Sequence, residues 1–333
     1  MKIAVLGGGS WGTALAKLLS DKGNDVNMWV YEKELVPIIN ETHENSMFLP
    51  GYKLSERLVA SNDIKSVVKD AELLLSVVPS QLVRGIFEQI KDDIPLYIPI
   101  VSASKGIEKA TSFLISEVLE DVLHEKYHYY LSFLSGPSFA KEVAMEQPTL
   151  VTVASINSKL NQRVQEIFST IFFRAYTTND VIGVEIGGAL KNVIAIGSGV
   201  IAGLGYGANT TAALITRGLA EMSRFSIARG ANPLTLSGLS GVGDLVLTAT
   251  SPLSRNWTVG NRLGKGESID DIISSMNMVA EGVKNAESIY LAAQKIDVEM
   301  PIFTTIYNVL YNGLSIEEGA IQLMTRSLKK EIY

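Results

Sequence analysis

The sequence contains no cysteine and only three histidines. Disulfide bonds, thiolate metal ligands and cysteine nucleophiles are therefore excluded, and the lack of cysteine fits a reducing compartment. The three are His43, which lies far from the others along the chain, and His124 and His128. A histidine-built metal site needs several such side chains together, so we expect no metal site.

Basic residues are also scarce, because 29 Lys and Arg against 35 Asp and Glu give a formal net charge of −6. No run of Lys or Arg is long enough to suggest a nucleic-acid patch, and no amphipathic basic segment indicates membrane attachment. We therefore expect no nucleic-acid partner, and any bound phosphate would be a small one held locally.

Long apolar runs are missing as well. The segment Val193–Gly207 contains a GxxxG spacing at Gly199 and Gly203, but it falls short of the roughly 20 residues that cross a bilayer. The N-terminal MKIAVLGGGSWG has too short an apolar stretch before its glycines for a signal peptide. We interpret the first as a buried helix and the second as a β-strand, and expect no membrane insertion.

The length of the chain indicates two domains, because 333 residues exceed the roughly 250 at which a single core stops growing. Residues 1–180 alternate β-type runs with helical patterns such as Gly12–Lys22 and Ser80–Ile90, which predicts an α/β domain with a parallel sheet. Residues 181–333 show helical patterns almost throughout, which predicts an all-α domain. The expected strands are Lys2–Leu6, Asp25–Val30, Leu73–Val77, Ile98–Ser102, Tyr130–Leu134, Thr149–Val153 and Arg174–Thr177.

The N-terminal glycines carry the first functional signal. Gly7, Gly9 and Gly12 have G-x-G-x-x-G spacing between a predicted strand and a predicted helix, the context of a Rossmann-type dinucleotide site. Ser10 and Trp11 would supply amides to the phosphates at the helix start. The alternative is a turn with a purely structural role.

The end of the second predicted strand bears on the cofactor. Glu32 lies 20 residues beyond Gly12, where an acid can bind the adenosine ribose and repel a 2′-phosphate. This favours NAD over NADP, although the neighbouring Lys33 could soften the preference. Glu32 could equally be a solvated charge at a strand end, so NADH and NADPH both stay open.

Lys191 is the only charged residue between Ile186 and Thr216. Apolar surroundings disfavour an ammonium and lower its pKa below the usual value of about 10.4, which suits a proton donor and acceptor. A lysine whose amine reaches solvent from a buried stem is the alternative. Periodicity alone does not separate the two.

Further motifs combine small residues with one or two charges, as backbone-lined sites for compact anions do. They are SASKGIE with Lys105, SGPSFAKE with Gly136 and Ser138, and GVGDLVLTATSPLSRNW with Asp244, Ser254 and Arg255. Arg255 is a candidate phosphate clamp, or else an ordinary salt bridge at a helix start. Asp244 could instead cap the helix that follows it.

Together with VVPS, EIGGALKNVIAIGSG and GANTTAALITRGLAEM, these motifs run in matching order to about residue 325. The chain resembles the bacterial NAD(P)-dependent glycerol-3-phosphate dehydrogenases. This resemblance implies a Rossmann-type domain joined to a helical substrate domain, and reversible reduction of dihydroxyacetone phosphate to sn-glycerol 3-phosphate for phospholipid synthesis. It also implies a cytoplasmic enzyme.

Transferred residue by residue, the resemblance makes Lys191 the proton donor and acceptor. The substrate contacts it implies are Lys105, Gly136, Ser138, Asp244, Ser254, Arg255 and Asn256. With the glycine loop and the second strand end, the implied cofactor contacts are Gly7, Gly9, Ser10, Trp11, Gly12, Tyr31, Glu32, Lys105, Ala140, Arg255, Val279 and Glu281. Tyr31 stands where relatives often have a basic or imidazole side chain, which disfavours a 2′-phosphate.

Two rival functions remain at this stage. A dehydrogenase of the same plan could act on another small carbonyl compound, and a dinucleotide-sensing protein could bind without catalysis. Lys191 and Lys105 argue against the second, and Arg255 favours a phosphorylated substrate. The small-residue helices of the second half could pack within one chain or across a homodimer.

Overall fold

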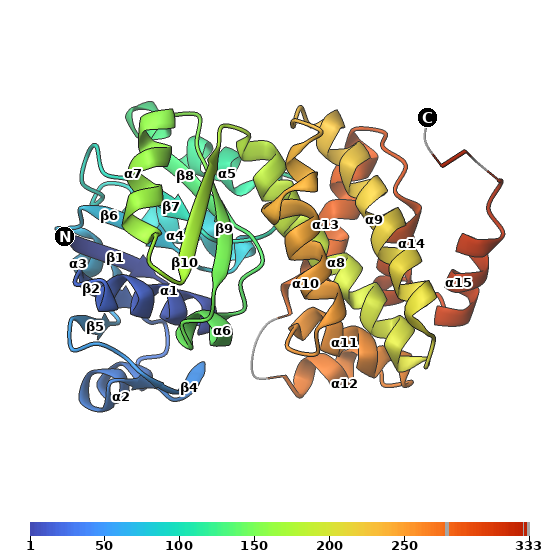
Figure 1. Cartoon of the computed structure of the whole chain (residues 1–333), viewed down its shortest axis with the longest axis horizontal. Coiled ribbons are helices and arrows are strands. Elements are labelled where there is room, and N and C mark those ends of the chain that lie inside the picture. The colour runs from blue at the N-terminus through green and yellow to red at the C-terminus, as the bar shows by residue number, and fades with distance from the viewer. Residues whose placement is uncertain (277–279, 329, 332–333) are drawn as a thin grey trace.

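The computed structural model describes residues 1–276, 280–328 and 330–331 of the chain. Figure 1 shows a sheet domain beside an all-helical domain, with the long helix α8 (Val181–Gly203) leading from one into the other. The predicted fold class, α/β followed by all-α, is confirmed.

One eight-stranded sheet forms the N-terminal domain, in the order β10-β9-β8-β7-β6-β1-β2-β5. The seven predicted strands are present with ends shifted by up to two residues, and the sequence patterns missed β3, β4 and β5. The strands are β1 (Lys2–Leu6), β2 (Asp25–Trp29), β3 (Glu44–Asn45), β4 (Leu49–Lys53), β5 (Leu58–Ser61), β6 (Leu73–Ser76), β7 (Ile100–Ser102), β8 (Leu131–Ser135), β9 (Thr149–Ala154) and β10 (Phe173–Thr178).

The sheet is not parallel throughout, as the sequence led us to expect. β9 pairs antiparallel with β8, while β9 and β10 are parallel to each other. The connection between β8 and β9 contains only the short helix α6 (Ala140–Ala144), which packs on α1 (Ser10–Asp21). Because no helix crosses back over the sheet there, the chain returns in the opposite direction.

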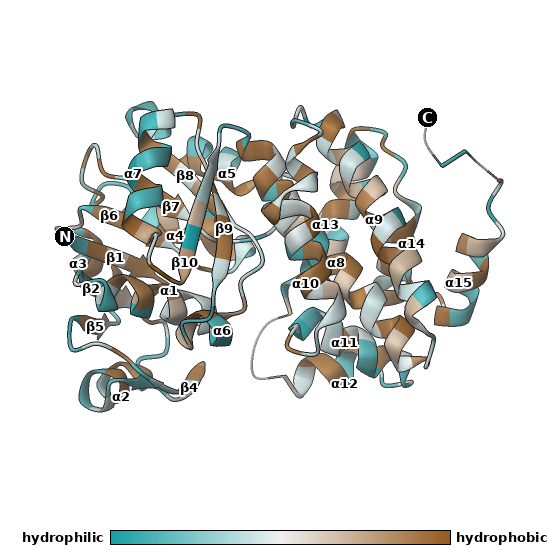
Figure 2. Ribbon diagram, in the orientation of Figure 1, coloured by the Kyte–Doolittle hydropathy of each residue, from teal (hydrophilic) through white to brown (hydrophobic). Residues whose placement is uncertain are grey.

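Alternation along the strands fills a core on each face of the sheet. In β1, Ile3 and Val5 belong to one buried cluster, and Ala4 and Leu6 to the other. The brown strands at the middle of the domain in Figure 2 show this apolar sheet between its two helical layers. α1 and α7 (Ser158–Phe168) cover the first face. The second face is covered by α3 (Ile64–Val68), α4 (Val83–Ile90) and α5 (Ile115–Val122).

The order of strands reverses at β1, because β2 lies on one side of it and β6 on the other. In open α/β sheets, ligands bind at the carboxyl ends of the strands where this reversal occurs. Both the glycine loop after β1 and the segment Val77–Ser80 after β6 lie at this point. The fold thereby brings two motifs to one crevice.

The C-terminal domain surrounds α8, which packs on several of its neighbours. Gly199 and Gly260 allow α8 and α11 to approach closely, because a Cβ atom on Gly199 would lie 2.0 Å from the Trp257 carbonyl oxygen and one on Gly260 1.9 Å from that of Ile196. The other helices are α2 (Leu35–Thr42) in the first domain and, in the second, α9 (Ala208–Ala228), α10 (Asp244–Thr250), α11 (Arg255–Gly264), α12 (Ile269–Ser274), α13 (Glu281–Lys295), α14 (Pro301–Tyr311) and α15 (Ile316–Met324).

Within the described residues, α8 is the one helix long and apolar enough to cross a membrane. Its most apolar window is 72% buried inside the protein. Protein neighbours therefore occupy most of the surface that lipid would need to contact, as in the core helix of a soluble domain.

Candidate active site

Lys191 lies midway along α8 and is buried, with only 7% of its surface exposed. Its Nζ donates a hydrogen bond to Oδ1 of Asp244. The alternative of a lysine that reaches solvent is therefore wrong. Asp180 anchors the start of this helix, because its carboxylate accepts the Gly183 N–H at 3.0 Å.

One carboxylate joins two lysines from the two domains. Asp244, which is 0% exposed, accepts from Lys191 at Oδ1 and from Lys105 Nζ at Oδ2, 2.8 Å away. Lys105 also donates to the Gly136 carbonyl oxygen at 3.3 Å. The alternative in which the Asp244 side chain caps α10 is wrong, because that carboxylate makes no capping bond.

The pKa of Lys191 is lowered to about 7, chiefly by burial. The nearby negative charge of Asp244 acts in the opposite direction, and the positive charge of Lys105 lowers the pKa further. An amine in this range exchanges a proton readily near neutral pH, as a general acid or base requires.

The predicted substrate contacts of SGPSFAKE lie beside this cluster. Gly136 follows β8 with φ +147°, and a Cβ there would lie 2.9 Å from Val151 Cα, so the loop requires glycine. Ser138 Oγ donates to the Gly136 carbonyl oxygen at 2.9 Å, and Ala140 begins α6.

Ser254, Arg255 and Asn256 form the start of α11. Ser254 is its N-cap and accepts the Trp257 N–H at 3.2 Å. Asn256 donates to Asn192 Oδ1 at 3.0 Å, so this α11 residue is tied to the residue after Lys191. Arg255 is exposed and makes no ion pair within 4.0 Å with any described residue, so the salt-bridge alternative is wrong.

Glu281 approaches the same place from α13. The Ser80 backbone in the crevice and the positive charges of Arg255, Lys105 and Lys191 all favour the charged form of its carboxylate. Burial nevertheless raises the pKa of Glu281. Val279, the other predicted contact of this segment, lies outside the described residues.

The glycine loop fits a dinucleotide. Gly7 has φ +116°, and a Cβ on Gly12 would lie 2.0 Å from the Gly7 carbonyl oxygen, so turn and helix pack as the fingerprint requires. A Cβ on Gly9 would meet nothing within 4 Å. The space beside Gly9 is therefore open at the start of α1, where helix N–H groups favour anions.

The residues predicted to bind the adenosine end of the dinucleotide are more exposed than the glycine loop. Tyr31 is 75% exposed and packs edge-on against Trp29, with ring centroids 6.3 Å apart. Glu32 is partly exposed beside it, and Trp11, after Ser10 in the first turn of α1, packs on the core. Here the structure brings together the predicted contacts of the loop and of the second strand end.

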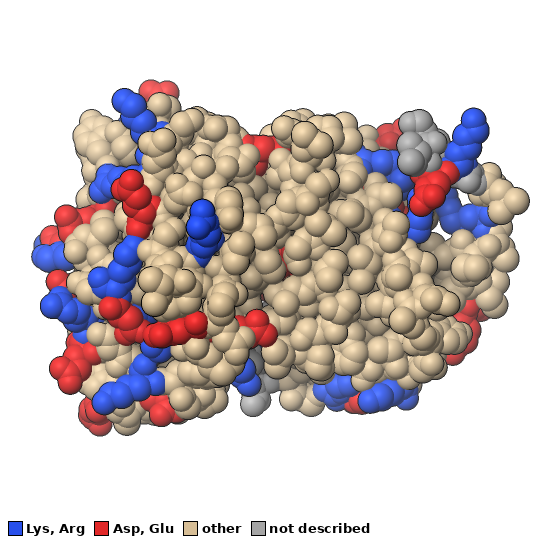
Figure 3. Space-filling model, in the orientation of Figure 1, with Lys and Arg blue, Asp and Glu red and all other residues tan. Residues whose placement is uncertain are grey.

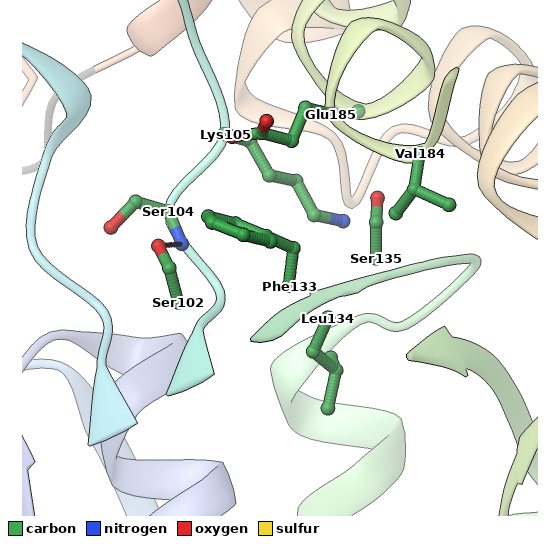
Figure 4. Close-up of a pocket in the computed structure, with 9 residues that line it drawn as sticks. Ser102, Ser104, Lys105, Phe133, Leu134, Ser135, Val184 and Glu185 are labelled. Carbon is green, nitrogen blue, oxygen red and sulfur yellow. Dashed lines mark hydrogen bonds between the residues drawn. The ribbon is translucent and has the colours of Figure 1, made fainter. Parts of the chain in front are cut away.

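Lys105 also lines a small cavity, together with residues that the sequence patterns did not single out (Figure 4). Ser135 Oγ is buried there and has no partner among the described residues. Glu185 of α8 accepts Ser116 N–H and Oγ–H at 2.9 and 2.5 Å, and burial raises its pKa to about 8. Ser135 and Glu185 are the first residues of the motifs SGPSFAKE and EIGGALKNVIAIGSG, and this position was the available signal for them.

Comparison with known proteins identifies the family. The model of the NAD-dependent glycerol-3-phosphate dehydrogenase N-terminus matches residues 2–161, and that of the C-terminus matches residues 180–320. The chain belongs to the NAD-dependent glycerol-3-phosphate dehydrogenase family. The resemblance drawn from the sequence motifs is therefore confirmed.

Relatives within the glycerol-3-phosphate dehydrogenase family match along the whole chain. Proteins named glycerol-3-phosphate dehydrogenase [NAD(P)+] from Leptospira biflexa and Citrifermentans bemidjiense are 54% and 52% identical over 331 and 330 residues. These alignments span 99% of this chain and 99% and 98% of the relatives. The solved glycerol-3-phosphate dehydrogenase of Coxiella burnetii has a TM-score of 0.93 at 37% identity, covering 98% of this chain and 99% of that one.

Proposed function

We propose that this protein reduces dihydroxyacetone phosphate to sn-glycerol 3-phosphate, reversibly, with NADH or NADPH. The observation that carries this proposal is the Lys191–Asp244–Lys105 cluster, which the two domains build together. Family membership names the reaction class, and the cluster supplies the acid–base group that such a reaction needs.

Reduction of the ketone requires a hydride at C2 and a proton at the carbonyl oxygen. A bound nicotinamide would supply the hydride. Lys191 in its ammonium form donates the proton, and as a neutral amine it accepts the proton when the alcohol is oxidised. Lys105 adds a second positive charge that stabilises the developing alkoxide.

The remaining substrate contacts are assigned by position. Arg255, exposed at the start of α11, binds the substrate phosphate through charge-assisted hydrogen bonds. Asn256, Ser254 and Ser138 contribute neutral hydrogen bonds, and the Gly136 loop lets the substrate approach the backbone. The glycine loop, Tyr31, Glu32, Ala140 and Glu281 would hold the dinucleotide, with Val279 in the segment before Glu281.

The decisive assay follows oxidation of NADH and of NADPH at 340 nm in the presence of dihydroxyacetone phosphate and, separately, of dihydroxyacetone. We expect turnover only with the phosphorylated ketone, and a higher kcat/KM with NADH because Glu32 repels a 2′-phosphate. Equal turnover of both ketones would contradict the substrate assignment, and a clear preference for NADPH would contradict the role of Glu32.

The pKa of Lys191 predicts opposite pH profiles for the two reaction directions. The ammonium predominates below a pKa of about 7, so kcat for ketone reduction should fall as pH rises through that range. The neutral amine predominates above it, so kcat for alcohol oxidation should rise. Initial rates at saturating substrates between pH 5.5 and 9 test this, and profiles with the same direction would contradict it.

We also propose that the protein is a cytoplasmic homodimer and is not inserted into a membrane. Its product, glycerol 3-phosphate, would be used in phospholipid synthesis. The middle of the helical domain shows almost no charge in Figure 3, and the start of α9 is largely exposed and uncharged from Ala208 to Thr216. A face depleted of charge is typical of subunit interfaces. A mass of one chain in light scattering at micromolar concentration would contradict the dimer.

A further inference from the structure

Asn45 is a fully buried polar residue that the catalytic scheme does not use. It lies in the short hairpin of β3 and β4 and is 0% exposed. Its Nδ2 donates to the Gly8 carbonyl oxygen at 2.7 Å and to Thr13 Oγ1 at 2.8 Å. A segment distant in the sequence is thereby joined to the middle of the glycine loop.

Two donors fix the Gly8 carbonyl. Besides Asn45, Thr13 Oγ1 of α1 donates to the same oxygen at 3.1 Å, and Thr13 is itself 0% exposed. The orientation of the Asn45 amide is also set, because its Oδ1 accepts the Phe48 N–H at 3.0 Å. Nδ2 must therefore be the group that faces Gly8.

Fixing this carbonyl also fixes the next amide. In a trans peptide the C=O of one residue and the N–H of the following residue point in opposite directions, and the described chain has no cis peptide bond. The Gly9 N–H therefore points away from Asn45 and Thr13. No described residue accepts a hydrogen bond from it, and the space beside Gly9 is open.

The hairpin holds the loop at a second point, since Ser10 Oγ donates to the Phe48 carbonyl oxygen at 2.6 Å. A Cβ on Gly8 would lie 2.9 Å from Val30 Cγ2, so the Val30 side chain packs closely beside the loop. These contacts restrict the movement of the loop.

We propose that Asn45, together with Thr13, is a positioning residue that aims the Gly9 N–H at the pyrophosphate of the dinucleotide. The inference rests on the proposed function only in requiring that the glycine loop binds a dinucleotide. Without the Asn45 amide, the Gly8–Gly9 peptide can rotate, and the Gly9 N–H then points at the pyrophosphate for only part of the time.

The test measures binding without catalysis. Kd values of NADH are obtained from its fluorescence, and those of ADP and adenosine by competition, for the unmodified protein, Asn45→Ala and Thr13→Val. We expect both variants to bind NADH and ADP about tenfold more weakly, which corresponds to loss of one aimed hydrogen bond. Adenosine, which has no phosphate, should bind within about twofold of normal.

The controls separate positioning from stability. Asn40→Ala removes an asparagine that makes two hydrogen bonds to Ala60 in the same domain, at 2.7 and 3.0 Å, without touching the glycine loop. It should leave the ratio of ADP to adenosine affinity unchanged. Thr13→Ser keeps the hydroxyl and should retain most of the ADP affinity.

The outcomes decide the proposal in either direction. Equal weakening of ADP and adenosine, or unchanged ADP affinity in both variants, would overturn it, and so would an unmodified protein that binds ADP no better than adenosine. If Asn45→Ala fails to fold, Thr13→Val decides alone. Selective loss of ADP affinity in a protein that does not reduce dihydroxyacetone phosphate would support the inference while contradicting the proposed function.

Discussion

Replacing Lys191 by methionine should lower kcat for reduction of dihydroxyacetone phosphate by at least about 10²-fold, the usual size of a general acid contribution. Methionine retains a similar length and apolar stem but has no proton to donate. The hydrogen bond that Lys191 donates goes to Asp244, and the glycine loop is predicted to hold the dinucleotide, so the Kd of NADH should stay within about twofold. Stopped-flow turnover and fluorescence titration of the same preparation measure both quantities.

The matched control is Lys265→Met, which alters an exposed lysine after α11 and should leave kcat unchanged. A Lys191→Met variant that turns over at a near-normal rate would contradict the role of Lys191. Loss of NADH binding in that variant would instead indicate a collapsed site, and a thermal melt would identify this case.

Replacing Asp244 by asparagine should have the largest effect on stability. The carboxylate is 0% exposed and is bound by both lysines, and removing one partner of a buried ion pair costs about 3 to 5 kcal/mol. Urea unfolding measures this loss. Glu267→Gln, which breaks the exposed ion pair with Arg262, is the control and should change stability far less, because exposed ion pairs contribute little.

The same variant should shift the pH profile. Because the charge of Asp244 raises the pKa of Lys191, its loss should move the decline of ketone reduction to lower pH than in the unmodified protein. If the pKa falls by one unit from about 7, the ammonium fraction at pH 7.5, and with it the activity, should fall about eightfold. An unchanged pH profile would show that Asp244 acts on stability alone.

Several features of the fold could be predicted because they depend on local sequence. The strand Lys2–Leu6, the glycine loop and the following helix come from adjacent residues whose periodicity and turn requirements agree. The reversal of β9 could not be predicted, since strand direction depends on how the chain returns after Gly136. The two strands of the Glu44–Lys53 hairpin are short and interrupted by Pro50 and Gly51, so they lack a clear strand pattern.

The site residues also divide into those that the local sequence indicated and those that it did not. Lys191, Lys105 and Asp244 could each be singled out in a motif, but their roles stayed ambiguous: Lys191 could have reached solvent, and Asp244 could have capped a helix. Asn45 had no signal at all, because a buried asparagine in a short hairpin looks like any polar loop residue in sequence.

By itself the sequence determined the residue types available for chemistry, the two-domain plan and the family resemblance, because these follow from local patterns and the order of motifs. Only the tertiary structure decided that one buried carboxylate joins Lys105 and Lys191, 86 positions apart in the printed sequence. Burial and charge pairing set the pKa of Lys191, and both arise from segments that meet only when the chain folds.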